Sequence, residues 1–277
     1  MSKSVAEILR DNNFRFNKQF GQNFITDTNL LDAIVADSGI TSEDIVVEIG
    51  TGAGTLTAAI AKVAKKVISF EIDRNLKEIL DITLSGLDNV QVVFSDIMKV
   101  SDSELQSIVC GKYKVVANLP YYITTPIIMR FLESEYKPES ISVMVQKEVA
   151  ERICSKANSS EYGAITAVVD LYANAEITRI VGKTNFYPVP KVDSAVLRLD
   201  VVENKYNCDK TKVKQIIKAA FAMRRKTLVN NLMQIGFTRE KIEGVLISLG
   251  IDLRVRGEVL NVPDFIRLAE NLLWKNC

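Results

Sequence analysis

The chain has 277 residues, of which 47% are hydrophobic, so it can build one large domain and a small one. It has no histidine, and its four cysteines (Cys110, Cys154, Cys208 and Cys277) lack metal-ligand spacing; this excludes His-based triads and histidine-ligated metals, and we expect free thiols and no metal site. The formal net charge is +1, no apolar stretch reaches the ~18 residues of a membrane helix, and the N-terminal residues lack a signal-peptide apolar region, so we expect a cytoplasmic protein.

Short apolar runs alternate with helical patterns through the first two hundred residues. Five runs predict buried strands: Ile45–Ile49, Lys66–Ile72, Val90–Phe94, Tyr113–Ala117 and Ile141–Val145. Three segments between them predict helices: Thr55–Ala64, Asn75–Leu84 and Thr125–Glu133. This alternation predicts an α/β fold, a Rossmann-like parallel sheet with helices on both faces.

The pattern changes after Val149. Three further runs predict strands that would form an antiparallel edge on the same sheet: Ala164–Tyr172, Glu176–Val181 and Ser194–Val201. Beyond a polar linker, apolar residues at three- and four-residue spacing predict helices: Lys212–Phe221, Arg225–Ile235, Arg239–Leu249 and Val262–Trp274. We therefore expect two domains, residues 1–204 with an N-terminal arm of residues 1–28, and a small all-helical domain of residues 205–277.

Positive charge is concentrated at the start of the helical region. Between Lys205 and Asn230 the chain carries eight lysines and arginines against one acid, Asp209. The stretch predicts either a solvated helix face or a surface that contacts nucleic acid.

A glycine-rich turn follows the first predicted strand. Glycines at 50, 52 and 54 let the backbone turn sharply and approach a cofactor closely, which makes Gly50 and Gly52 candidate cofactor-binding residues. The spacing is G-x-G-x-G, whereas NAD-binding folds carry G-x-G-x-x-G. Together with the acidic Glu48 before the turn, this spacing favours S-adenosylmethionine over a dinucleotide.

Acidic residues also follow the next two predicted strands. Glu71 is placed to accept hydrogen bonds from ribose hydroxyls, and Asp96 is placed to accept one from an adenine amino group. The alternative for each acid is a helix N-cap, and for Asp73 we favour the cap. Ligands bind at the carboxyl ends of the strands in open parallel sheets, where Glu71 and Asp96 fall.

The segment Asn118-Leu119-Pro120-Tyr121 closes the fourth predicted strand. The Asn118 side-chain oxygen and the Leu119 carbonyl could grip the two N–H groups of a planar amine, and Tyr121 could stack on its ring. Such positioning makes a weakly nucleophilic adenine N6 ready to accept a methyl group without a strong base. The alternative is an ordinary turn.

A long loop joins two of the later predicted strands. In it, Phe186 could close the other face of a base flipped out of its stack. The alternative is a loop aromatic packed on the core.

Taken together, these motifs make the chain resemble the bacterial 16S ribosomal RNA adenine dimethyltransferases, the kasugamycin-sensitivity family. The resemblance covers nearly the whole chain. It rests on residues 20–24, 48–54, 118–121, 145–149, 186–196 and 221–228.

The resemblance implies that four methyl groups pass from S-adenosylmethionine to the N6 amines of two adjacent adenosines near the 3′ end of 16S rRNA. The substrate would be a partly assembled small ribosomal subunit, with a further role in its assembly. It also implies that residues 1–204 form the catalytic domain and residues 205–277 bind rRNA, in a monomer that contacts no membrane.

Carried over residue by residue, the family's cofactor contacts fall on Asn23, Ile25, Gly50, Glu71, Asp96 and Asn118. Its target-base contacts fall on Asn118, Leu119, Tyr121 and Phe186, and its basic C-terminal segment on Arg224, Arg225 and Lys226. Two residues depart from the pattern: Ile25 replaces a leucine, and Met223 replaces a polar residue.

Two rival interpretations remain. A 23S rRNA adenine dimethyltransferase of the macrolide-resistance type would share the sheet and the loop chemistry, although the segments around Phe186 and Arg224 favour the 16S enzyme. A non-catalytic ribosome-assembly factor would lack a reason to keep the complete set of cofactor residues.

Overall fold

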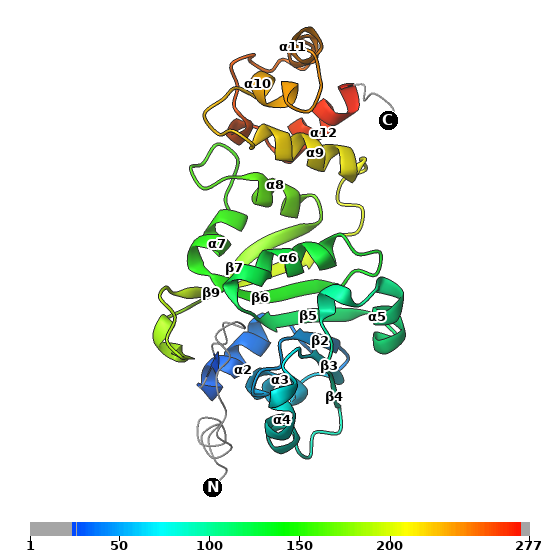
Figure 1. Cartoon of the computed structure of the whole chain (residues 1–277), viewed down its shortest axis with the longest axis vertical. Helices are drawn as coiled ribbons and strands as arrows, with labels where there is room; N and C mark the ends of the chain where they lie inside the picture. The colour runs from blue at the N-terminus through cyan, green and yellow to red at the C-terminus, as the bar shows by residue number, and fades with distance from the viewer. Residues whose placement is uncertain (1–23, 26, 273–277) are drawn as a thin grey trace. The chain divides into compact units, whose positions relative to one another are not determined.

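The computed structural model describes residues 24–25 and 27–272 (Figure 1). Asn23, a predicted cofactor contact, and Cys277 lie outside the described residues.

A seven-stranded sheet forms the centre of the first part of the chain, in the order β4-β3-β2-β5-β6-β9-β7. Its strands are β2 (Ile45–Ile49), β3 (Lys66–Phe70), β4 (Val90–Val93), β5 (Tyr113–Asn118), β6 (Ser140–Gln146), β7 (Ala173–Val181) and β9 (Ser194–Val201). The first five are parallel, and β9 is antiparallel to β6. The predicted Rossmann-like sheet with an antiparallel edge is therefore confirmed.

Helices cover both faces of this sheet because alternate strand residues point to opposite sides. They are α2 (Thr28–Asp37), α3 (Thr55–Ala61), α4 (Lys77–Thr83), α5 (Asp102–Val109) and α6 (Tyr121–Leu132), with α7 (Lys147–Ile153) following β6. On one face, Val46 and Val116 share a core cluster with residues of α2 and α3. On the other, the Tyr113 ring on β5 meets Phe131 on α6, with ring centroids 6.4 Å apart.

Several elements were not predicted. The sequence patterns predict neither helices α2, α5 and α7 nor the two-stranded antiparallel ribbon of β1 (Phe24–Ile25) and β8 (Phe186–Tyr187). Short 3₁₀ turns lie at Arg74–Leu76, Ile97–Lys99, Lys183–Asn185 and Gly257–Val259.

The strand predicted at Ala164–Tyr172 is wrong. The segment forms helix α8 (Ala164–Asp170), which begins where the Gly163 N–H donates to the Thr166 hydroxyl at 3.4 Å. Its central residues, Thr166 to Val169, are all buried, so the segment has no polar stripe of helical period. A short, continuous apolar run does not distinguish a buried helix from a buried strand.

The chain divides into two compact units, residues 1–150 with 176–201 and residues 151–175 with 202–277. The second unit is helical, with α8 followed by α9 (Lys210–Ala220), α10 (Leu228–Met233), α11 (Arg239–Ser248) and α12 (Val262–Asn271). The four predicted C-terminal helices are thus present within a residue or a few of their expected bounds. The assignment of residues 1–204 and 205–277 to separate functional domains stays a prediction.

A buried carboxylate ties β2 to its neighbours in the first unit. Glu48 is fully buried, and its Oε2 accepts hydrogen bonds from the Thr57 hydroxyl on α3 at 2.6 Å and the Ser69 hydroxyl on β3 at 2.7 Å. Its other oxygen, Oε1, has no hydrogen-bond partner among the described residues. Burial, with a smaller contribution from the Glu71 charge, raises the pKa of Glu48 from 4.5 to about 7.

We expect Glu48→Gln to change how stability depends on pH. In the wild type, the raised pKa of Glu48 adds to the free energy of unfolding. This contribution is fully present below pH 4.5 and is lost as the pH rises through about 7. A pKa raised by this much corresponds to roughly 3 kcal/mol. Urea titrations should therefore show the variant gaining stability relative to wild type, by up to about 3 kcal/mol, between pH 4.5 and pH 8.

The exposed Glu78 on α4 supplies the matched control, Glu78→Gln. Its stability difference from wild type should stay nearly constant with pH. If the stability difference between Glu48→Gln and wild type is also constant with pH, the raised pKa of Glu48 is contradicted.

Candidate active site

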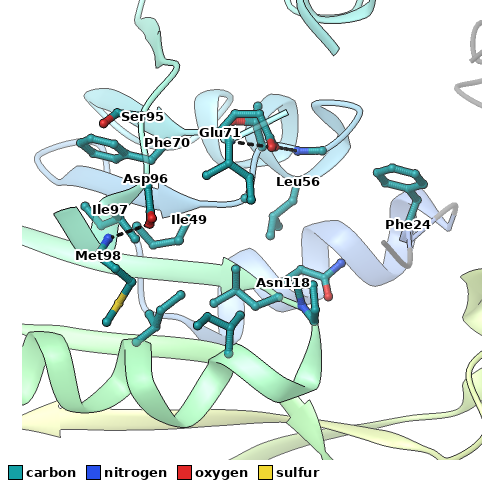
Figure 2. Close-up of a pocket in the computed structure, with 18 of the residues that line it drawn as sticks. Phe24, Ile49, Leu56, Phe70, Glu71, Ser95, Asp96, Ile97, Met98 and Asn118 are labelled. Atoms are coloured by element: carbon teal, nitrogen blue, oxygen red, sulfur yellow. Dashed lines mark hydrogen bonds between the residues drawn. The ribbon is translucent and has the colours of Figure 1, made fainter. Parts of the chain in front are cut away.

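A cavity of the first unit opens where the strand order reverses. The chain leaves β2 toward β3 and leaves β5 toward β6, so the loops after these parallel neighbours diverge at the carboxyl edge. A cavity of about 420 Å³ lies there, within the size range of small-molecule sites. In Figure 2, the segment from Ser95 to Met98 lies at one end of this cavity, and Asn118 and Phe24 lie at the other.

The glycine turn leaves room for this cavity. Gly50 and Gly52 both line it, with φ angles of +80° and +55° that favour glycine. A Cβ on Gly52 would lie 2.8 Å from Cε1 of Phe24. The missing Cβ therefore lets the Phe24 ring pack against the turn and complete one wall, while the predicted approach of this backbone to a cofactor stays a prediction.

Glu71 lies in the cavity wall just past β3, as predicted. Its Oε1 accepts from the backbone N–H groups of Ile72 and Asp73, and its Oε2 accepts from that of Gly52, each at 2.8 Å. Burial raises the pKa of this carboxyl, although the three N–H donors oppose the rise. A carboxylate has about four acceptor positions, so three backbone donors orient Glu71 and leave it capacity for a hydroxyl.

Asp96 caps a turn and also lines the cavity, while its contact with an adenine amino group stays a prediction. Its Oδ1 caps the 3₁₀ turn at Ile97–Lys99 by accepting from the Met98 N–H at 3.0 Å, and the residue also lines the cavity. Asp73 caps the preceding 3₁₀ turn through Asn75, as favoured, and does not line the cavity.

The loop Asn118–Pro120 lines the cavity at the end of β5. Pro120 begins α6, and its carbonyl accepts from the Thr124 hydroxyl at 3.2 Å, which holds the first turn. Tyr121 is turned away from the cavity lining, and its hydroxyl lies 2.8 Å from the Ser194 hydroxyl on β9. Tyr122, which the sequence analysis did not single out, lines the cavity instead.

Phe186 and Ile25 pair with each other in the β1–β8 ribbon. Phe186 is only 3% exposed and packs in the core cluster that contains Val181 and Val196. In this arrangement the ring follows the packed alternative, so its contact with a target base stays a prediction. Ile25 lines the cavity, where its leucine-like side chain is compatible with the predicted backbone contact.

Apolar residues that follow the strand-tip acids also line the cavity. Ile72 comes after Glu71, and Ile97 and Met98 come after Asp96. The sequence contains the information needed to predict these residues. An apolar residue beside each acid provides a surface on which a flat ring can pack while the acid accepts a hydrogen bond.

The basic triplet lies in the second unit, in the connection between α9 and α10. Arg224, Arg225 and Lys226 are all exposed, and the Arg224 guanidinium donates to the Ser160 carbonyl at 2.8 Å. This exposure fits either a solvated segment or a phosphate-binding surface.

Neither a metal centre nor a membrane span is found in the described part of the chain. Within residues 24–25 and 27–272, no three His, Cys, Asp or Glu side chains gather to hold a metal ion. No described helix has the length and apolarity needed to cross a bilayer.

Comparison with known proteins places these features in a family context. Residues 13–272 match the family model described as ribosomal RNA adenine dimethylase. The chain is 45% identical over 289 residues to the ribosomal RNA small subunit methyltransferase A of Bacillus licheniformis, covering 98% of each. It is 44% identical over 271 residues to the protein of that name from Clostridioides difficile, covering 96% of this chain and 94% of the relative.

Two solved structures share the fold over most of its length. A dimethyladenosine transferase from Plasmodium falciparum superposes with a TM-score of 0.75 at 27% identity, over 88% of this chain and 95% of that one. The 23S rRNA methyltransferase ErmE superposes with a TM-score of 0.69 at 25% identity, over 90% and 99%.

We expect Glu71→Gln to weaken S-adenosylmethionine binding about 10- to 100-fold, because the amide replaces one charged acceptor with a donor that faces backbone N–H groups. Calorimetry of the purified protein measures the change. Asp73→Asn is the matched control, since the neighbouring side chain caps a turn and does not line the cavity. Equal dissociation constants for wild type and Glu71→Gln would refute the assigned contact.

Proposed function

The chain belongs to the ribosomal RNA adenine dimethylase family, and we propose that it methylates the N6 amines of two adjacent adenosines near the 3′ end of 16S rRNA. The methyl donor is S-adenosylmethionine, and each adenosine receives two methyl groups. The substrate is a partly assembled small ribosomal subunit, and an assembly role accompanies catalysis.

One observation carries this proposal: Asn118 shares a single cavity with the glycine turn, Glu71 and Asp96. The turn provides bare backbone, Glu71 provides an oriented carboxylate for hydroxyls, and Asp96 with Met98 provides an acceptor beside an apolar surface. In this order, these groups suit the amino-acid part, the ribose hydroxyls and the adenine of S-adenosylmethionine. Asn118 lies at the opposite end of the cavity from Asp96 (Figure 2).

The residues of the loop would do their work by positioning. When bound, the cofactor supplies an electrophilic methyl group on a sulfonium. The Asn118 side-chain oxygen and the Leu119 carbonyl accept hydrogen bonds from the two N–H groups of the target amine and draw its nitrogen toward tetrahedral geometry, so that the lone pair is no longer delocalised into the ring. Pro120 and the Thr124 hydroxyl hold these acceptors still, so that little reorganisation remains for the reaction.

The small-subunit substrate is favoured over the 23S alternative. Relatives named for the small subunit are 45% and 44% identical over nearly the full chain, whereas the 23S enzyme ErmE is 25% identical. The non-catalytic alternative is disfavoured by the cavity itself, which Ile25, Gly50, Gly52, Glu71, Asp96 and Asn118 line together.

The second unit supplies the RNA contact in this proposal. Arg224, Arg225 and Lys226 are exposed together and available for phosphate groups. The protein acts as a monomer in the cytoplasm, where its subunit substrate is assembled.

The direct test incubates the protein with labelled S-adenosylmethionine and small subunits from a strain that lacks this methylation. Mass spectrometry of the digested rRNA should find dimethyladenosine at two adjacent positions near the 3′ end. A parallel reaction on 23S rRNA is the control, and modification of that RNA alone, or of neither substrate, would refute the proposal.

We expect Asn118→Ala to lower kcat roughly 100- to 1,000-fold at saturating cofactor, because it removes one of two acceptors that grip the reacting amine. Asn271→Ala, on the last turn of α12, should leave kcat unchanged, and thermal unfolding should show that both variants fold. Near-normal turnover by Asn118→Ala would remove this residue from the mechanism.

Replacing Arg224, Arg225 and Lys226 together with Gln should weaken subunit binding and leave cofactor affinity unchanged. Each lost phosphate contact should reduce the slope of log affinity against log salt by roughly 0.7–0.9. Binding titrations at several salt concentrations measure this slope. Superimposable salt curves for wild type and variant would identify the triplet as a solvated segment.

A further inference from the structure

Two exposed tyrosines stand next to the two aromatic residues expected to hold the target base. Tyr122 follows Tyr121 and is 67% exposed, and Tyr187 follows Phe186 and is 55% exposed. The two expected residues are turned inward, Tyr121 toward Ser194 and Phe186 into the core cluster. The outward aromatic surface therefore belongs to their neighbours.

Tyr122 lies at the rim of the cavity. It lines the cavity, yet two thirds of its surface meets solvent, so its ring stands where the opening reaches the outside. It is the second residue of α6, and helical side chains lean toward the N-terminus of their helix. Its ring therefore leans toward the loop that carries Asn118.

Tyr187 flanks the same end of the cavity from another element. In the β1–β8 ribbon it is paired in register with Phe24, and paired residues share one face. Phe24 lines the cavity at the Asn118 end (Figure 2). Tyr187 thus stands beside the wall that Phe24 forms, and its side chain is much more exposed to solvent than that of Phe24.

The surroundings of Tyr187 suit a nucleic-acid strand. The loop between β7 and β9 also exposes Lys183 and Lys191, which offer positive charge to phosphates. Exposed aromatic faces beside cations are the usual means of holding unpaired bases, since every base has a stackable face.

We propose that Tyr122 and Tyr187 stack on the nucleotides that flank the target adenosine, and that the second adenosine of the pair waits on one of these rings outside the cavity. This inference rests on the proposed function. The two acceptors on Asn118 and Leu119 grip one target amine at a time, so methylation of two adjacent adenosines requires a place for the neighbour during each reaction. A tyrosine ring beside the opening can hold that neighbour outside the cavity and still allow it to enter for its own reaction.

The test uses Tyr122→Ala, Tyr187→Ala and the corresponding Phe variants on unmethylated small subunits. Each Ala variant should raise KM for the subunit roughly 5- to 100-fold, because one base–aromatic stack is lost. The kcat should stay within about threefold, since the stack forms equally before and during methyl transfer. The Phe variants keep the ring and should behave as wild type.

Ile247→Ala is the matched control, because this residue of α11 is also 67% exposed and carries no ring. Its KM should not change. Calorimetry with S-adenosylmethionine supplies a second readout: the dissociation constants of the Tyr187 variants and of Ile247→Ala should stay within about twofold of wild type, and that of Tyr122→Ala, whose ring lines the cavity, should change less than its KM does.

Three results would overturn the inference alone while wild-type methylation stands. They are an unchanged KM in both Ala variants, Phe variants as defective as the Ala variants, or cofactor binding weakened as strongly as KM. The last would show that Tyr122 serves only as a wall of the cofactor cavity. If the wild type fails to methylate small subunits, the proposed function and this inference fall together.

Discussion

The parallel pairing of β2 with β5 is the constraint on which the rest of the site depends. These strands are neighbours in space but are separated in the chain by β3 and β4, so their outgoing loops run in opposite directions. One loop becomes the glycine turn and the other becomes Asn118–Pro120. Cofactor groups and target groups therefore meet across one opening, although more than sixty residues separate them along the chain.

Two glutamates near this opening show how position decides what a carboxylate does. Glu48 is still within its strand, so its side chain enters the core. One carboxyl oxygen accepts from two hydroxyls, and the other has no hydrogen-bond partner among the described residues. Glu71 is one residue past its strand, where the turning backbone presents three N–H groups. The first carboxyl takes up a proton easily because its charge is poorly solvated, whereas the second is an oriented acceptor.

The strand tips were predictable from the sequence because apolar runs mark buried strands and their carboxyl ends share one edge. Glu71, Asp96 and Asn118 fell in the expected cavity for that reason. The direction of individual rings was not predictable, since Tyr121 is held by a hydroxyl on β9, seventy-three residues away. Helix α8 was missed because its four central residues are all buried and carry no periodic signal, and only its packing in the second unit decides its structure.

The β1–β8 ribbon makes the completion of the cavity a late event in protein synthesis. Phe24 precedes the parallel strands in the chain, but its partner Tyr187 follows all of them. A nascent chain that ends before β8 has the glycine turn, the acids and Asn118, yet it lacks the strand that pairs with β1. The pairing of β1 with β8 therefore cannot form until residue 187 has been synthesised, when nearly the entire first unit exists.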